Sequence, residues 1–339
     1  MTHEGVFRTN TVRFALTDDG VALPVIDVTS PAFALTAGEP EVAERCRLFV
    51  EESRARQNMS AEARAQMMQA LRGSRLAQAL TQASGGYLSG LATYLMKLGP
   101  DHLWPDAGEV DKRIAASFPA WTARLRLQDV ARLLAEGLTP QLEREPTQPL
   151  ILVNIAGGPA SDAINALLVV RAASPNALAH RRTVIWVLDS DHVGSSFGKR
   201  SLAALCVPGA PLDGLDLQLH HEEYDWNETA VLEARMQQAV QTGHHFAVTS
   251  EGGLFEYGSD EAIVANLSVV RRHTGPQTIV VGSVTRNDGA AVEARGETNV
   301  ATKPRSLGQF AALAAAGGWR VDEALEGPFS RQVRLVAIV

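Results

Sequence analysis

The sequence predicts an α/β fold in which a doubly wound, mostly parallel sheet of seven strands with an antiparallel last strand follows a mainly helical N-terminal region. Two observations lead to this prediction. After residue 148, five apolar runs alternate with helical segments, and the last two apolar runs are joined by a short link that contains Gly and Pro. Strands that alternate with helices imply right-handed crossovers and parallel pairing, whereas a link too short for a helix implies antiparallel pairing.

The first part of the chain has few glycines and a mostly helical pattern up to the polar stretch 143–149. Apolar residues recur every three or four positions, as in amphipathic helices, in segments 40–57, 60–82 and 129–143. Ser60 is the expected N-cap of the second helix. Segment 13–28 predicts two short strands around a turn, and segment 84–104 predicts a helix that Gly99-Pro100 ends. We expect two domains, 1–148 and 149–339, the first serving as lid, substrate-binding and dimerisation region.

The second part contains the apolar runs that we expect to form the sheet. Predicted strands lie within segments 149–158, 181–191, 215–226, 244–253, 278–286, 318–325 and 331–339. Predicted helices lie within segments 162–174, 195–206, 228–241, 259–273 and 306–318. The closing link is 326–330, so the last two strands pair antiparallel.

Composition limits the function classes. The 339 residues carry a net charge of -7, which disfavours nucleic acid and anionic membranes as partners. The sequence contains no run of about 18 apolar residues, so we expect no membrane-spanning segment. The two cysteines provide no disulfide framework, and the first residues lack the apolar core of a secretory signal, so we expect a cytoplasmic protein. The N-terminal region is longer than a lid requires, so a homodimer is a further expectation.

Polar and glycine residues follow the first three predicted strands of the sheet, where ligands bind in open α/β folds. The first strand ends in Asn154-Ile155-Ala156-Gly157-Gly158, where glycines let a ligand approach the backbone. The second ends in Asp189-Ser190, an acid suited to ribose hydroxyls, and the third in Asp225-Trp226, suited to an adenine amine and ring. Each has a plainer interpretation: a tight turn, a helix cap, or a buried Trp beside a cap. Together they predict an adenosine-type ligand.

The glycines, the acid, the Asp-aromatic pair and the closing antiparallel strand resemble a class I, Rossmann-like S-adenosylmethionine (SAM)-dependent methyltransferase over residues 149–339. Segment 249–267 is similar to the segment after the fourth strand in carboxyl- and O-methyltransferases of this class. The resemblance implies SAM as cosubstrate, with Asn154, Ala156, Gly157 and Gly158 near its methionine part. It also implies Asp189 and Ser190 at the ribose, Asp225 and Trp226 at the adenine, and Ser250 and Glu251 beside the sulfonium. The glycine spacing differs from the family pattern, and Asn154 replaces its usual acid.

Four residues are candidates for the chemistry. Tyr87 and Tyr94 are seven positions apart and would share one helix face, from which they could close over the sulfonium by cation–π attraction. Core packing is the plainer interpretation of this pair. Glu256 and Tyr257 follow the fourth strand and could act as general base or substrate orienter, or could be surface loop residues. We expect no metal, because the doublets His220-His221 and His244-His245 would point to opposite faces of a strand.

Three functions remain open at this stage. The first is methyl transfer from SAM to a small molecule, in specialised metabolism. The second is the SAM-cyclising branch, in which the amine of SAM attacks its own Cγ to give azetidine-2-carboxylate and methylthioadenosine; a neutral Asn154 would favour the free amine that this reaction needs. The third is a SAM-binding partner without catalysis, supported by the altered glycine spacing.

Overall fold

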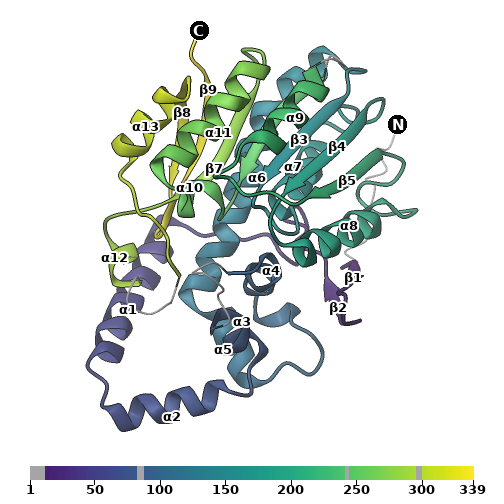
Figure 1. The fold of residues 1–339 in the computed structure, drawn as a ribbon. Helices are drawn as coiled ribbons and strands as arrows, with labels where there is room; N and C mark the ends of the chain where they lie inside the picture. Colours follow the sequence, from purple (N-terminus) through teal and green to yellow (C-terminus); the bar gives the residue numbers. More distant parts are fainter. Residues whose placement is uncertain (1–11, 82–87, 241–243, 295–299) are drawn as a thin grey trace.

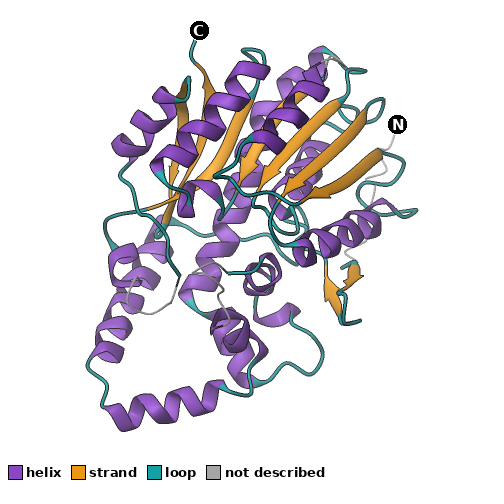
Figure 2. Ribbon diagram, in the orientation of Figure 1, coloured by secondary structure: helices purple, strands orange, loops and turns teal. Residues whose placement is uncertain are grey.

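The computed structural model describes residues 12–81, 88–240, 244–294 and 300–339, and its centre is a seven-stranded sheet (Figures 1 and 2). The order of the strands is β5-β4-β3-β6-β7-β9-β8. Their bounds are β3 Leu150–Ile155, β4 Arg182–Leu188, β5 Asp216–Glu222, β6 His245–Ser250, β7 Ile279–Thr285, β8 Trp319–Glu326 and β9 Ser330–Ala337. All seven strands lie where the apolar runs predict them.

The first five strands are parallel and the last pairing is antiparallel, as predicted. β9 lies between β7 and β8 and runs antiparallel to both. Every residue of β3, β6 and β7 is buried. A central strand covered on both faces shows a continuous apolar run rather than an alternating pattern, which explains why these segments were so clear in the sequence.

Helices cover both faces of the sheet (Figure 2). On one face lie α6 (Phe118–Arg144), α7 (Ser161–Ala173) and α8 (His192–Cys206); on the other lie α9 (Ala230–Val240), α11 (Asp260–His273) and α13 (Leu307–Ala316). Successive side chains of β3 enter opposite layers: Leu150 and Leu152 pack with the first group, and Ile151 and Val153 with the second. The predicted doubly wound architecture is therefore confirmed.

The N-terminal part combines a small hairpin with short helices (Figure 1). The hairpin strands are β1 (Phe14–Leu16) and β2 (Ala22–Pro24), as predicted. The helices are α1 (Glu39–Gln57), α2 (Ala61–Leu71), α3 (Arg75–Thr81), α4 (Gly90–Lys97) and α5 (Glu109–Ala116), with a short 3₁₀ turn at Pro100–His102. In Figure 1, α2 projects away from the sheet, and no residue of α2 is buried.

The single helix predicted over 60–82 is wrong, because the chain breaks between α2 and α3. Ser60 does cap α2, accepting a hydrogen bond from the backbone N–H of Ala63. A second capping serine, Ser74, follows Gly73 and accepts from the N–H of Ala77, while its hydroxyl donates to the buried Asp111 at 2.7 Å. This local capping ends one helix and begins another, which periodicity does not reveal.

Helix α6 links the N-terminal part to the sheet. Its leucines share one core with β3, α7 and residues of α4. A Cβ on Gly137 of α6 would lie 2.5 Å from the Ile279 side chain of β7, so the helix backbone lies close to the sheet there. The division at residue 148 stays a prediction, but the two parts have a common core. Homodimerisation likewise stays a prediction.

Candidate functional site

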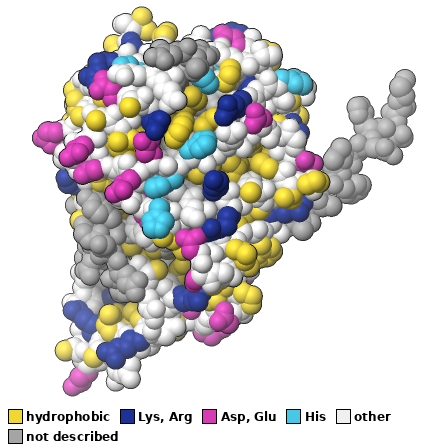
Figure 3. All heavy atoms as spheres, turned by 45° about the vertical axis from the view of Figure 1, so that its right-hand side comes forward, with side chains coloured by type: hydrophobic (Ala, Val, Ile, Leu, Met, Phe, Trp, Pro, Cys, Tyr) yellow, Lys and Arg dark blue, Asp and Glu magenta, His cyan; other side chains and the backbone are white. Residues whose placement is uncertain are grey.

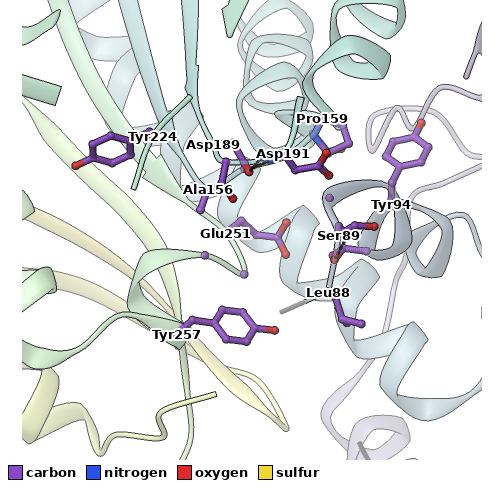
Figure 4. Close-up of a pocket in the computed structure, with 18 of the residues that line it drawn as sticks. Leu88, Ser89, Tyr94, Ala156, Pro159, Asp189, Asp191, Tyr224, Glu251 and Tyr257 are labelled. Atoms are coloured by element: carbon purple, nitrogen blue, oxygen red, sulfur yellow. Dashed lines mark hydrogen bonds between the residues drawn. The ribbon is translucent and has the colours of Figure 1, made fainter. Parts of the chain in front are cut away.

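A cavity of about 600 Å³ lies at the carboxyl ends of β3, β4, β5 and β6 and is closed on one side by α4 (Figure 4). Residues after all four strands line it, so the topology brings together the segments that the sequence singled out. Predicted site residues among the lining are Ala156, Gly157, Gly158, Asp189, Ser190, Asp225, Trp226, Glu251, Tyr94 and Tyr257.

The glycine turn after β3 has an unusual backbone. Ala156, Gly158 and Ala160 all have positive φ angles, of 55°, 50° and 55°. Such conformations are rare for alanine and are typical of functional turns that the surrounding structure holds in place. A Cβ on Gly157 would lie 1.3 Å from the Oδ1 atom of Asn154, so only glycine fits there.

Asn154 lies beneath this turn and does not line the cavity. It is fully buried, and its amide donates to the carboxylate of Asp162 at 2.6 Å. Thr249 of β6 also donates to Asp162. Burial raises the pKa of Asp162, and the nearby Glu251 carboxylate raises it further. Asn154 therefore supports the turn from below, which differs from the expected contact with the cofactor.

Asp189 fixes the shape of the cavity wall after β4. Its two carboxylate oxygens accept hydrogen bonds from the backbone N–H groups of Gly158 and Asp191, each at 2.8 Å. Burial raises the pKa of Asp189, although the two N–H groups oppose this effect. The carboxylate joins the glycine turn to the segment after β4, and Ser190 and Asp191 extend the same wall.

The segment after β5 forms the far end of the cavity. Asp225 is exposed and accepts hydrogen bonds from the backbone and side chain of Asn227 at 2.9 and 2.7 Å. Asn266 of α11 holds the segment from behind, because it accepts from the Tyr224 hydroxyl at 2.6 Å and donates to the backbone oxygen of Trp226 at 2.8 Å. Asp225 and Trp226 thus border the cavity together, as the sequence predicted.

Ser250 and Glu251, the two site residues predicted at the end of β6, lie in different environments. Ser250 is buried under the turn, where its hydroxyl donates to the backbone oxygen of Ile155 at 2.9 Å, and it does not line the cavity. Glu251 does line it, and its carboxylate pairs with Lys97 of α4 and with Arg126 of α6. Burial alone would raise the pKa of Glu251, but these two cations outweigh it and lower the pKa.

Glu256 and Tyr257 of α10 (Leu254–Tyr257) also differ from each other. The carboxylate of Glu256 is buried and accepts from Arg126 at 3.1 Å and from Ser283 at 2.6 Å, and it lines neither this cavity nor the neighbouring one. Because it lines neither cavity, Glu256 holds Arg126 rather than facing a substrate. Tyr257 lines both cavities, and Figure 4 shows its ring extending across the space toward Leu88.

The sequence predicts that Tyr87 and Tyr94 lie together on the lid, and the structure describes only the second of them. Tyr87 lies outside the described residues. Tyr94 contributes its ring to the cavity wall, but its hydroxyl donates to the backbone oxygen of Pro24 at 2.6 Å and accepts from the N–H of Ile26 at 3.0 Å. Burial raises the pKa of Tyr94. This hydroxyl anchors the N-terminal chain to α4, so core packing, the plainer interpretation, fits its contacts.

Helix α4 packs directly on the glycine turn. A Cβ on Gly90 would lie 2.6 Å from the Cα of Gly158, and a Cβ on Gly158 would lie 2.6 Å from the Cα of Gly90. Gly194 and Gly198 of α8 pack against the same turn. Only residues without a side chain allow this contact, which brings the first turn of α4 over the cavity.

A second cavity, of about 610 Å³, adjoins the first. The two share the lining residues Leu88, Thr93, Gly252 and Tyr257. The second cavity lies between the N-terminal helices and the segment after β8. Apolar residues line much of its wall: Leu35, Val42, Ala43, Met96, Pro119, Ala123, Pro328 and Phe329. Five charged residues line it as well: Glu39, Arg126, Asp129, Arg286 and Glu326. No pattern in the sequence predicts this cavity.

Lys97 and Arg126 are the functional candidates that the sequence analysis missed. Lys97 is three positions from Tyr94 on the apolar face of α4, and a charge on such a face is a signal that could have drawn attention to it. Its side chain is only 5% exposed. Arg126 is one of several arginines in α6, and nothing in its local sequence distinguishes it.

Within the described parts of the chain, no group of three His, Cys, Asp or Glu side chains has an arrangement that could hold a metal ion. None of the helices described there is both long and apolar enough to cross a membrane. On the face shown in Figure 3, acidic and basic side chains are interspersed.

No family model matches the chain, and no curated protein matches its sequence. Solved structures do match its fold. The structure of a possible exported protein from Bordetella parapertussis has a TM-score of 0.56 at 15% identity, over 90% of this chain and 98% of that protein. The fold is Rossmann-like.

An O-methyltransferase and a biosynthetic protein are among the further structural neighbours. Mitomycin 7-O-methyltransferase MmcR has a TM-score of 0.39 at 17% identity, over 68% of this chain and 58% of its own. The pyocyanin biosynthetic protein PhzM has a TM-score of 0.37 at 15% identity, over 69% of this chain and 59% of its own. The chain therefore spans less than two thirds of the length of either protein.

Proposed function

We propose that this protein is a SAM-dependent methyltransferase that acts on a small molecule in specialised metabolism. The observation that carries the proposal is the pair of adjoining cavities. One is acidic and lies where nucleosides bind in this fold. The other has a wall of apolar residues interspersed with charges of both signs, and the two cavities meet at four shared residues.

The charges of the first cavity favour SAM over a phosphate-bearing nucleotide. Among the described residues, four carboxylates and one ammonium line it: Asp189, Asp191, Asp225, Glu251 and Lys97. SAM has a sulfonium, an ammonium and one carboxylate and is a net cation, so an acidic wall attracts it. A pyrophosphate would be repelled by the same wall. Asp189 would accept hydrogen bonds from the ribose hydroxyls, and Trp226 would offer a ring for the adenine.

The second cavity is suited to the methyl acceptor. Its volume, and its combination of apolar and polar lining residues, are typical of sites for small organic molecules. Because Thr93, Gly252 and Tyr257 border both spaces, an acceptor held in the second cavity would meet the first at these residues.

SAM when bound supplies an activated methyl group, so the protein has mainly to orient the acceptor and exclude water. Helix α4 and its contact with the glycine turn close the first cavity on one side. Tyr257 is the side chain best placed to orient an acceptor, since its ring lies at the junction of the two spaces. The partly buried Arg126, held by Glu251 and Glu256, supplies fixed positive charge beside Gly252.

The cyclase alternative loses its main argument. It relied on Asn154 as a neutral partner of the SAM amine, but Asn154 is buried under the turn and hydrogen-bonded to Asp162. A reaction of SAM alone would also leave the second cavity without a role.

The test is incubation of the purified protein with SAM, with and without a panel of small aromatic acceptors, and analysis of the nucleosides by mass spectrometry. We expect SAM to bind in calorimetry, to persist when it is alone, and to yield S-adenosylhomocysteine with an acceptor. Methylthioadenosine and a four-carbon amino acid product from SAM alone would overturn the methyltransferase in favour of the cyclase. An absence of SAM binding would overturn the assignment of the first cavity.

A further inference from the structure

A buried ion pair on the wall of the first cavity contributes to the charge of that cavity, but neither of its members has yet been matched to a particular group of SAM. Lys97 Nζ and Glu251 Oε2 are in contact, and their side chains are only 5% and 3% exposed. Both residues line the cavity. Removing two charges from water is costly, so such a pair is seldom explained by stability alone.

The other carboxylate oxygen of Glu251 continues into a charge network. Oε1 accepts from Arg126 Nε at 2.5 Å, and Arg126 Nη1 donates to Glu256 at 3.1 Å. Arg126 is therefore engaged by two carboxylates. Lys97 has Glu251 as its hydrogen-bond partner among the described residues, and an ammonium has three donors. Lys97 lines the first cavity and Arg126 does not, so Lys97 is the cation of this network whose remaining donors face a ligand there.

The position of the pair follows from the order of the strands. Asp225 and Trp226 follow β5, at one edge of the sheet, whereas Glu251 follows β6, on the other side of β3. A nucleoside whose base lies at Trp226 and whose ribose lies at Asp189 would extend its 5′ substituent past the glycine turn toward Glu251. Asp162, directly under that turn, is close enough for the charges of both Glu251 and Lys97 to act on its carboxyl group.

We propose that Lys97 and Glu251 bind the α-amino acid end of SAM, with Lys97 donating to its carboxylate and Glu251 accepting from its ammonium. The inference rests on the proposed function. An adjacent cation and anion on a buried wall are the complement of a zwitterion, and the low surrounding polarity strengthens both contacts. Because Lys97 belongs to α4, recognition of the amino acid end also requires this helix to lie over the glycine turn.

The experiment compares three nucleosides by calorimetry: S-adenosylhomocysteine, its decarboxylated analogue with an aminopropyl chain, and methylthioadenosine, which lacks the amino acid end. With the unmodified protein, we expect the decarboxylated analogue to bind roughly 10- to 100-fold more weakly than S-adenosylhomocysteine, the range for a hydrogen bond between charged groups. Lys97→Met should bring these two affinities to within about threefold of each other while changing methylthioadenosine binding little. Lys112→Met, on the exposed surface of α5, is the matched control and should change none of them.

Equal affinity of the unmodified protein for S-adenosylhomocysteine and its decarboxylated analogue would overturn the inference, without dependence on any variant. The inference would also be overturned if Lys97→Met lost the same factor in affinity for all three nucleosides, because a purely structural role of Lys97 gives that result. If the unmodified protein binds none of the three, the proposed function itself fails, which is a different result from either of these.

Discussion

Replacing Tyr94 with Phe separates the role expected from the sequence from the one seen in the structure. The side chain is 3% exposed. Its hydroxyl bridges two buried backbone groups, donating to the oxygen of Pro24 at 2.6 Å and accepting from the N–H of Ile26 at 3.0 Å. The ring, which Phe retains, packs edge-on against Phe197, with 4.8 Å between the two ring centroids. The substitution thus removes one oxygen atom and leaves the packing in place.

The expected loss in the free energy of unfolding follows from two backbone groups that lose their partner, the oxygen of Pro24 and the N–H of Ile26. An unsatisfied buried donor or acceptor costs roughly 1–3 kcal/mol, so the pair should lower the free energy of unfolding by about 3 kcal/mol. At about 2.1 cal/mol/K per residue, the unfolding entropy of 339 residues is roughly 0.7 kcal/mol/K, which gives a fall in Tm of about 4 °C. We expect the turnover of the folded variant to change less than about threefold, because the hydroxyl faces the N-terminal chain.

Differential scanning calorimetry and turnover per folded molecule test this. Tyr224→Phe is the control, since it deletes the same atom from a buried tyrosine. Among the described residues, its hydroxyl makes one hydrogen bond, to Asn266 at 2.6 Å. Its Tm should fall by about half as much. An unchanged Tm together with lost turnover in Tyr94→Phe would refute this reasoning and restore Tyr94 as a participant in the chemistry.

Three further predictions concern the glycine contacts and the acid of the first cavity. Gly90→Ala should weaken SAM binding about tenfold in calorimetry, because the new Cβ would lie 2.6 Å from the Cα of Gly158; unchanged affinity would mean that α4 does not close the cavity. SAM affinity should fall as the pH drops through the pKa of Asp189, which burial raises above 3.8, because the protonated acid loses acceptor capacity. The variant Asp189→Asn should bind SAM weakly, with an affinity that does not depend on pH in this range. A pH profile of Asp189→Asn like that of the unmodified protein would contradict this prediction. Gly137→Val should lower the free energy of unfolding in urea by about 1–3 kcal/mol and leave SAM affinity unchanged. Its Cβ would lie 2.5 Å from the side chain of Ile279, and its two methyl groups add volume at this contact; no loss of stability would show that α6 shifts at no cost.

The sequence was most informative where a local pattern and a topological rule act together. Continuous apolar runs identified the strands, and the short link 326–330 identified the antiparallel pairing of β8 and β9. Parallel strands place their carboxyl ends at one edge, so residues after three separate strands, such as Gly158, Asp189 and Trp226, were expected around one cavity, and all three line it.

What only the tertiary structure decided is the direction of each side chain and its partner from a distant part of the chain. Asn154 and Ser250 lie within the last two residues of their strands but point beneath the glycine turn, because burial and hydrogen bonds to Asp162 and Ile155 hold them there. Lys97 and Glu251 are 154 residues apart, and no local pattern links them. Periodicity reports which residues are buried, whereas contacts between α4, α6 and the end of β6 depend on how whole elements pack.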